Sequence, residues 1–262
     1  MKITKAVILA GGLGTRMAPI SKVIAKEMLP VANKPVMEYL VKSLESVGIN
    51  QILIVSHKDK IEIQNYFQNG KQMFYFVYPE KPLGVANALL HAENFVKDEP
   101  FVLLYGDVLF SSSRALKQML DLFYQSNKSI VLSKRVLKSQ ISLYGVLCYN
   151  KIGNYNYIYN IIEKPKGINL SSNKVITGQF ILKPDIFSIL KDLKTYELFT
   201  DALLKLSKQN DLLLKEFKGK FFDIGSRAGF FIANTYFSLK DPDLGKEIKK
   251  ICGEFDIRKG LK

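Results

Sequence analysis

Cysteine is scarce in this chain, and so are the segments that would carry it across a membrane. Its 262 residues include two cysteines, Cys148 and Cys252, which lie far apart, so neither a disulfide framework nor a zinc site is indicated. The apolar run near the N-terminus is too short for a signal peptide, and no segment approaches the length of a membrane span. We therefore expect a cytoplasmic protein without a membrane partner.

The chain also lacks a basic arm, although its net charge is +14. This charge arises from 38 lysines and arginines against 24 acidic residues, and it is compatible with a nucleic-acid partner, a polyanionic small substrate or a lysine-rich composition. The basic residues are scattered among the acids, and the aromatic residues lie in apolar segments instead of alternating with arginine. We therefore favour the last two explanations over a nucleic-acid partner.

No internal repeat, low-complexity segment or linker divides the sequence, and its 47% apolar content suffices for one full core. Strand-like runs alternate with helix-like segments through the first half, and one helix is expected between Pro35 and Gly48. This alternation predicts an α/β fold with a mixed, mostly parallel sheet flanked by helices. Residues 144–182 are strand-rich, so we expect a β-rich lobe beside that sheet.

The most informative stretch starts with an apolar strand, residues 6–10, that runs into a glycine turn. Gly11, Gly12 and Gly14 allow a tight turn in which backbone N–H groups approach anionic oxygens. Two familiar phosphate loops do not match, because no Gly-Lys-Ser/Thr ends the run and the third glycine of the dinucleotide fingerprint is missing. The glycines alone are weak evidence for a phosphate site.

Three cations follow this turn, at Arg16, Lys22 and Lys26. A triphosphate undergoing transfer needs fixed positive charge where negative charge accumulates. The two lysines could equally belong to a solvated basic turn, because lysine is abundant in this chain, whereas arginine occurs only five times. Arg16 is therefore the stronger indication of a phosphate-handling site.

Two aspartates follow apolar segments that are far apart in the sequence. Asp107 comes after the strand-like run 101–105, at the position where open α/β sheets bind ligands, and Asp223 follows two phenylalanines. Each could simply cap a turn or a helix. Two carboxylates from distant segments are also what a hard cation such as Mg²⁺ needs, with phosphate oxygens and water completing its shell.

Glu163 and Lys164 end another strand-like run, and Gly178 lies in the next one. A carboxylate can accept hydrogen bonds from sugar hydroxyls while an adjacent lysine contacts a phosphate. A glutamate–lysine pair on a loop is more often ordinary surface charge.

Together, the segments GGLGTRM, PISK, KEMLP, EKPK and FFDIGSRAG resemble the sugar-phosphate nucleotidyltransferases, and the last favours their uridylyl branch. The resemblance covers nearly the whole chain. It implies a single Rossmann-like domain over residues 1–262, of the nucleotide-diphospho-sugar transferase type. Residues 1–135 would bind the nucleotide, residues 136–240 the sugar phosphate, and residues 241–262 would form a C-terminal helix and tail. The implied reaction joins UTP and glucose 1-phosphate into UDP-glucose and pyrophosphate, with Mg²⁺ as cofactor, in a homo-oligomer, either a dimer or a tetramer.

The resemblance also implies a role for each candidate residue. Arg16 and Lys26 would be catalytic, and Asp107 and Asp223 would hold the metal. Glucose would contact Glu163 and Gly178, with its phosphate on Lys164. The nucleotide-binding residues would be Leu9, Ala10, Gly11, Gly12, Gly14, Thr15, Glu80, Gly84 and Asp107.

Residues 78–86 depart from the family pattern, because they lack the longer insertion and the glutamine common in uridylyltransferases and resemble a form that guanylyl enzymes share. If Glu80 faces the base, it is a pure acceptor that takes two donors from guanine and one from uracil. If it faces solvent, backbone groups near Leu9, Gly11 and Gly84 would bind uracil. A guanylyl-, thymidylyl- or cytidylyltransferase remains an alternative, as does a catalytically silent homologue that senses sugar nucleotides.

Overall fold

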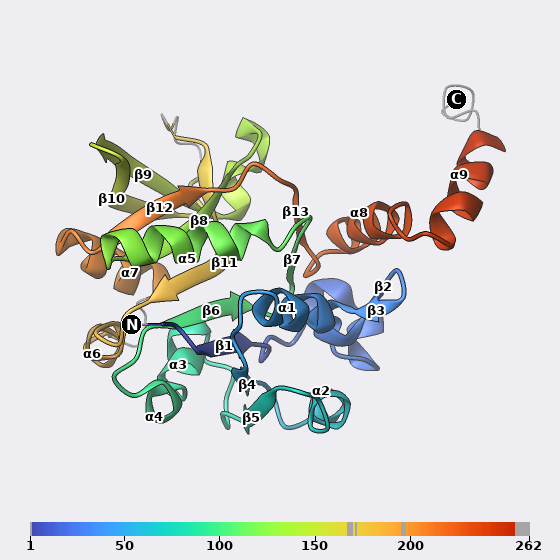
Figure 1. Cartoon of the computed structure of the whole chain (residues 1–262), viewed down its shortest axis with the longest axis horizontal. Coiled ribbons are helices and arrows are strands. Elements are labelled where there is room, and N and C mark those ends of the chain that lie inside the picture. The colour runs from blue at the N-terminus through green and yellow to red at the C-terminus, as the bar shows by residue number, and fades with distance from the viewer. Residues whose placement is uncertain (1, 167–169, 171, 195–197, 255–262) are drawn as a thin grey trace.

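A central sheet organises the chain, and its strands follow the order β5-β4-β1-β6-β11-β8-β12-β10-β9 among the described residues (Figure 1). The computed structural model describes residues 2–166, 170, 172–194 and 198–254. The sheet strands are β1 (Lys5–Leu9), β4 (Gln51–Val55), β5 (Met73–Val77), β6 (Phe101–Tyr105), β8 (Ser129–Arg135), β9 (Gly145–Ile152), β10 (Tyr155–Glu163), β11 (Lys174–Leu182) and β12 (Leu212–Glu216).

Strand direction divides this sheet into two parts. β5, β4, β1 and β6 are parallel to one another, and β12 is parallel to β8. β11 is antiparallel to both β6 and β8, and β10 is antiparallel to both β12 and β9. The mixed α/β fold is therefore confirmed, but the sheet is less parallel than predicted. A run buried on both faces has the same apolar composition in either direction, so composition could not reveal the orientation of β11.

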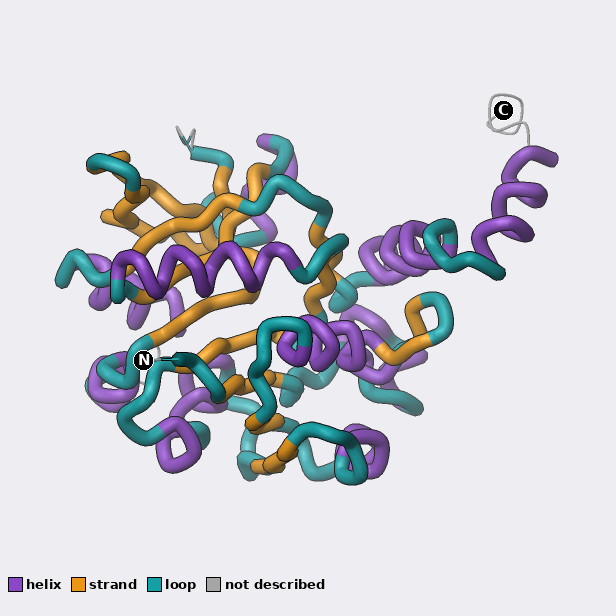
Figure 2. Tube along the Cα trace, viewed as in Figure 1, coloured by secondary structure: helices purple, strands orange, loops and turns teal. Residues whose placement is uncertain are grey.

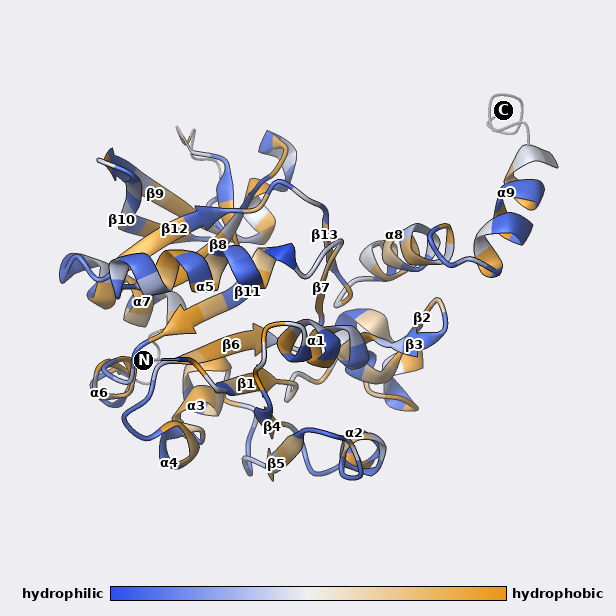
Figure 3. Cartoon of the chain, in the orientation of Figure 1, coloured by the Kyte–Doolittle hydropathy of each residue, from blue (hydrophilic) through white to orange (hydrophobic). Residues whose placement is uncertain are grey.

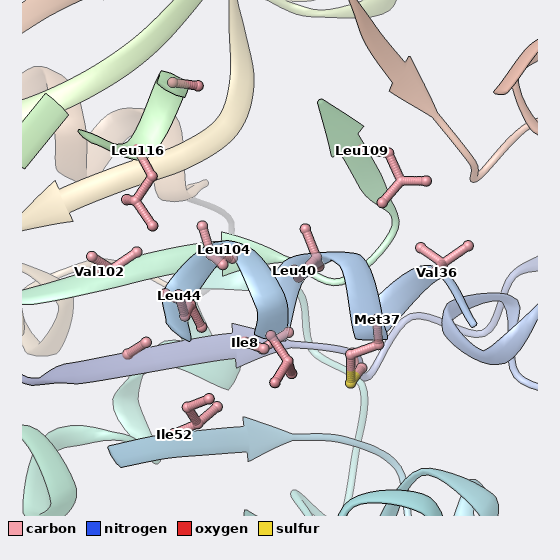
Figure 4. Packing of buried hydrophobic residues seen from close by; sticks show 14 of the residues in the cluster. Ile8, Val36, Met37, Leu40, Leu44, Ile52, Val102, Leu104, Leu109 and Leu116 are labelled. Carbon is pink, nitrogen blue, oxygen red and sulfur yellow. The ribbon is translucent and has the colours of Figure 1, made fainter. Parts of the chain in front are cut away.

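Helices cover both faces of the sheet and enclose two apolar cores. One core lies between the sheet and α1, α5 and α8, and the other between the sheet and α3, α6 and α7. Neighbouring residues of β1 alternate between them, since Ile8 belongs to the first core and Val7 to the second. Figure 4 shows Leu40 and Leu44 of α1 above Ile8 in the first core.

The helices follow the sequence signals that predicted them. α1 begins directly after Pro35, buries Leu40 and Leu44 at helical spacing, and is followed by Gly48 with a φ of 78°. The predicted helix between Pro35 and Gly48 is confirmed. The described helices are α1 (Val36–Glu45), α2 (Ile61–Phe67), α3 (Val85–Leu90), α4 (Glu93–Val96), α5 (Arg114–Ser126), α6 (Ile186–Lys191), α7 (Phe199–Lys208), α8 (Arg227–Ser238) and α9 (Leu244–Glu254).

Two short ribbons lie at the edge of the body. β2 (Pro30–Val31) pairs with β3 (Lys34–Pro35), and β7 (Val108–Phe110) pairs antiparallel with β13 (Phe221–Asp223). In the second ribbon Val108 lies opposite Asp223, and the N–H of Ile224 donates to the carbonyl of Asp107 at 2.8 Å. This ribbon therefore brings the two candidate metal-binding aspartates together.

The last two described helices extend away from the sheet (Figures 1 and 2). α8 buries Phe230 and Ala233 but exposes Phe231 and Ile232. Figure 3 shows polar and apolar residues mixed along α9, in contrast to the apolar strands β6 and β11. None of the helices in the described ranges is both long and apolar enough to span a membrane.

Candidate active site

The glycine turn follows β1 and forms the floor of the site. Gly14 has a φ of 66° and begins the 3-10 helix Thr15–Met17, a conformation that favours glycine. A side chain on Gly11 would meet nothing within 4 Å, and one on Gly12 would lie 3.4 Å from Lys26 Nζ. The loop backbone is therefore open to a ligand, with a lysine ammonium directly beside it.

Lys26 belongs to the 3-10 helix Lys26–Met28 and reaches across to the strand-end aspartate. Its Nζ donates to Asp107 Oδ2 and lies 3.9 Å from Glu27 Oε1. Burial lowers the pKa of Lys26, but the carboxylates of Asp107 and Glu27 outweigh burial and raise the pKa overall. Lys26 is therefore a fixed cation at the turn.

Lys60, which the sequence did not suggest, stabilises the same turn from below. Its Nζ donates to the carbonyl oxygens of Ala10 and Gly12 at 2.6 and 2.7 Å and to Glu27 Oε2 at 2.8 Å. Glu27 is 1% exposed, and burial raises its pKa although Lys60 and Lys26 oppose the shift. Because Lys60 precedes α2 and lacks a recognisable motif, no sequence signal could have revealed this contact.

Asp107 and Asp223 face a common point. A Cβ on Gly225 would lie 2.9 Å from Asp223 Oδ1 and 3.1 Å from Asp107 Oδ2. Burial and then the charge of Asp107 raise the pKa of Asp223, and Arg16 opposes this from 3.7 Å. Two neighbouring carboxylates that repel each other are a suitable pair for a divalent cation. The described residues contain no group of three or more protein ligands, so substrate oxygens or water would have to complete its shell.

A first cleft of about 440 Å³ opens above the turn. Glu80 is exposed and lies outside its lining, and Ala10 is buried behind the lining. Ser56 and His57 do line it, and the buried Ser56 Oγ has no hydrogen-bond partner among the described residues. The predicted nucleotide residues that this cleft brings together are Leu9, Gly11, Gly12, Gly14, Thr15, Gly84 and Asp107.

A second cleft of about 570 Å³ adjoins the first, and Tyr105 and Asp107 line both. The structure brings Arg16, Asp223, Glu163, Lys164 and Gly178 to this second cleft. Lys22 is exposed and lines neither of the two. The sequence predictions for sugar phosphate and metal therefore converge on one place.

Gly178 and Glu163 have close neighbours in the second cleft. Gly178 has a φ of 81°, and a Cβ there would lie 2.7 Å from the ring of Tyr105. Lys164 Nζ lies 3.5 Å from Glu163 Oε1, and Thr200 at the start of α7 lies near Glu163 across Gly145. Tyr105 and Thr200 were not among the predicted site residues, since one looked like a strand residue and the other like a helix cap.

Comparisons with known proteins agree with this arrangement. A UTP–glucose-1-phosphate uridylyltransferase from Staphylococcus epidermidis is 30% identical over 286 residues, covering 98% of this chain and 99% of that protein. The UTP-bound UGPase from Acinetobacter baumannii superposes with a TM-score of 0.90 at 28% identity, covering 97% of this chain and 100% of that one. A UDP-glucose pyrophosphorylase solved with UDP-glucose gives a TM-score of 0.86 at 32% identity, covering 92% and 100%.

The family model described as nucleotidyl transferase matches residues 5–238, which include both clefts and the ribbon that holds the aspartates. The resemblance predicted from the sequence motifs is thereby confirmed, and this chain belongs to the nucleotidyl transferase family.

Proposed function

We propose that this protein transfers a uridylyl group from UTP to glucose 1-phosphate, giving UDP-glucose and pyrophosphate. The observation that carries this proposal is the pair of adjoining clefts that share Tyr105 and Asp107. One cleft offers a glycine turn for a nucleotide, and the other offers Glu163 and Lys164 for a sugar phosphate. The relatives named above carry the same activity in their names.

In this mechanism a phosphate oxygen of glucose 1-phosphate attacks the α-phosphorus of UTP in line with the departing pyrophosphate. The attacking phosphate is already anionic at neutral pH, so no general base is required, and catalysis relies on positioning and charge neutralisation. Lys26 and Arg16 neutralise the triphosphate and the leaving group, and Lys164 orients the nucleophile. Asp107 and Asp223 fit a hard divalent cation, which we propose to be Mg²⁺, and the ion supplies further charge at the reacting phosphates.

The exposed position of Glu80 bears on the choice of base. A side chain outside the cleft cannot bond the two donors of a guanine, so we propose that backbone groups near Leu9, Gly11 and Gly84 bind uracil. This favours the uridylyl reaction over the guanylyl alternative.

Pyrophosphate release tests the proposal, measured for UTP, dTTP, GTP and CTP, each with glucose 1-phosphate and with mannose 1-phosphate. We expect strong activity for UTP with glucose 1-phosphate, and only when Mg²⁺ is present. A preference for another nucleotide would overturn the base assignment. Nucleotide binding without turnover across the panel would instead favour the sensing homologue.

We also propose a homo-oligomer, either a dimer or a tetramer, that works in the cytoplasm. The exposed Phe231 and Ile232 of α8, which are 62% and 60% exposed, are the apolar surface that such an assembly would cover. Light scattering of the purified protein checks this, and a monomer at micromolar concentration would contradict it.

A further inference from the structure

A third cavity lies behind the sugar-phosphate cleft and belongs to neither part of the active site. It has a volume of about 240 Å³ and is enclosed by α1, β7 and the residues that precede α5. Gln179 of β11 lines it, whereas the preceding residue, Gly178, lines the sugar-phosphate cleft. Since α1 and α5 cover the sheet face opposite to α7, the two hollows lie on opposite faces.

Gln179 is the unusual residue of this cavity. It is 3% exposed, and its Oε1 is buried with no hydrogen-bond partner among the described residues. A buried amide oxygen without a donor costs free energy, and most such groups in proteins have a partner. The cavity therefore contains an acceptor that lacks the donor it needs.

The opposite wall of the cavity supplies donors. Ser112 and Ser113 line it and lead directly into α5, a helix of 13 residues. Ser113 stands at the N-cap but makes no capping hydrogen bond, so the N–H groups of Ala115 and Leu116 receive no capping side chain. Helix N-termini attract anions through such free N–H groups and through the helix dipole.

Lys42 also lines the cavity, but it adds little to this attraction. Its Nζ lies 2.7 Å from Glu38 Oε1, and its side chain is half-exposed. The N-terminus of α5 and the hydroxyl of Ser113 are therefore the groups that would hold an anion.

We propose that this cavity binds inorganic hydrogenphosphate. This ion combines oxygens that accept from the N-terminus of α5 with one P–OH group that donates to Gln179 Oε1. Sulfate has the same shape but carries no proton at neutral pH, so it would place an anionic oxygen against the unpaired oxygen of Gln179. The site should therefore discriminate between the two ions by about tenfold, the equivalent of one hydrogen bond.

Calorimetric titration of the full chain with inorganic phosphate, and separately with sulfate, tests this proposal. The titrations are repeated with Lys26→Met, which removes a phosphate ligand of the active site, so binding there is distinguished from binding in the cavity. We expect phosphate to bind the native protein and Lys26→Met alike, and sulfate to bind about tenfold more weakly. Equal affinity for both ions, or loss of phosphate binding in Lys26→Met, would overturn the proposal.

Gln179→Met removes the acceptor while keeping the side-chain length, and Gln118→Met, at an exposed position on α5, is the matched control. We expect Gln179→Met to lose phosphate binding and Gln118→Met to keep it. Without phosphate, Gln179→Met should melt at the same or a higher temperature than the native protein, because an unpaired buried oxygen is gone. Phosphate binding that persists in Gln179→Met would identify an adventitious ion only.

Discussion

Replacement of Lys60 by methionine tests whether its ammonium holds the glycine turn in place. Methionine keeps the apolar stem but removes all three hydrogen bonds of Lys60, at 2.6, 2.7 and 2.8 Å, and leaves the buried Glu27 without its nearest cation. Removing one partner of a buried ion pair costs about 3–5 kcal/mol. Lys26 still lies 3.9 Å from Glu27, so we expect the lower end of this range, about 3 kcal/mol.

Thermal unfolding measures this loss. In a chain of this length, 3 kcal/mol corresponds to a fall in Tm of about 10 °C. The control is Lys58→Met, whose position is exposed and which should change Tm by less than about 2 °C. Adding Glu27→Gln to Lys60→Met removes the unpaired charge and should recover most of the loss. A double variant that is no more stable than Lys60→Met would refute the reasoning.

The pH dependence of the same pair follows from Glu27. Burial raises its pKa above 4.5, and Lys60 and Lys26 limit the rise. Since the folded state then holds the proton more tightly than the unfolded chain, ionised Glu27 costs stability above its folded pKa, and this cost disappears as the pH falls toward 4.5. Losing Lys60 raises the pKa further, so the deficit of Lys60→Met should shrink between about pH 7.5 and about pH 5.5. A deficit that stays constant over this interval would contradict the assignment.

Three further variants test the active site. Arg16→Ala should lower turnover by about 10²-fold or more without lowering Tm, since its side chain is 65% exposed, and near-normal turnover would contradict its role in charge neutralisation. Gly178→Ala should raise the KM for glucose 1-phosphate more than the KM for UTP, because the new Cβ would lie 2.7 Å from the ring of Tyr105; an equal effect on both would place the clash elsewhere. Asp223→Asn should weaken activation by Mg²⁺, seen as a higher Mg²⁺ concentration at half-maximal rate, and an unchanged value would remove Asp223 from the metal site.

The parts of the fold and site that the sequence predicted are those with a local signal. β1 is apolar at every position but its first, and glycines follow it directly, so the strand and the turn could be located without the rest of the chain. Asp107 could be placed at a strand end for the same reason. Pairing Asp107 with Asp223 required the family resemblance, because the β7–β13 ribbon that joins them is three residues long on each side and has no turn of its own.

Contacts that depend on geometry were out of reach. Thr200 enters the second cleft because α7 starts at Phe199, one residue before it, and a helix start varies by a residue or two in any sequence-based assignment. Glu80 was a reasonable base-binding residue from its chemistry, but its side chain lies outside the cleft. A strand or loop residue shows which chemistry it offers, whereas its direction depends on the packing around it.

Lys60 explains how a turn without a standard phosphate-loop motif could still bind a triphosphate. In a trans peptide the C=O and N–H groups point in opposite directions, so carbonyls held by Lys60 turn the following N–H groups away from it. Ala10 and Gly12 provide those carbonyls, and the N–H groups that follow belong to Gly11 and Leu13, which both line the nucleotide cleft.

The KM for UTP measures this orientation directly. We expect Lys60→Met to raise it by about tenfold, the equivalent of one charge-assisted hydrogen bond, with little effect on the KM for glucose 1-phosphate. The binding of uridine, which has no phosphate, should be unchanged, because only groups that face the triphosphate are affected. A variant that loses uridine and UTP affinity to the same extent would show that Lys60 supports the whole cleft instead of orienting the N–H groups of the turn.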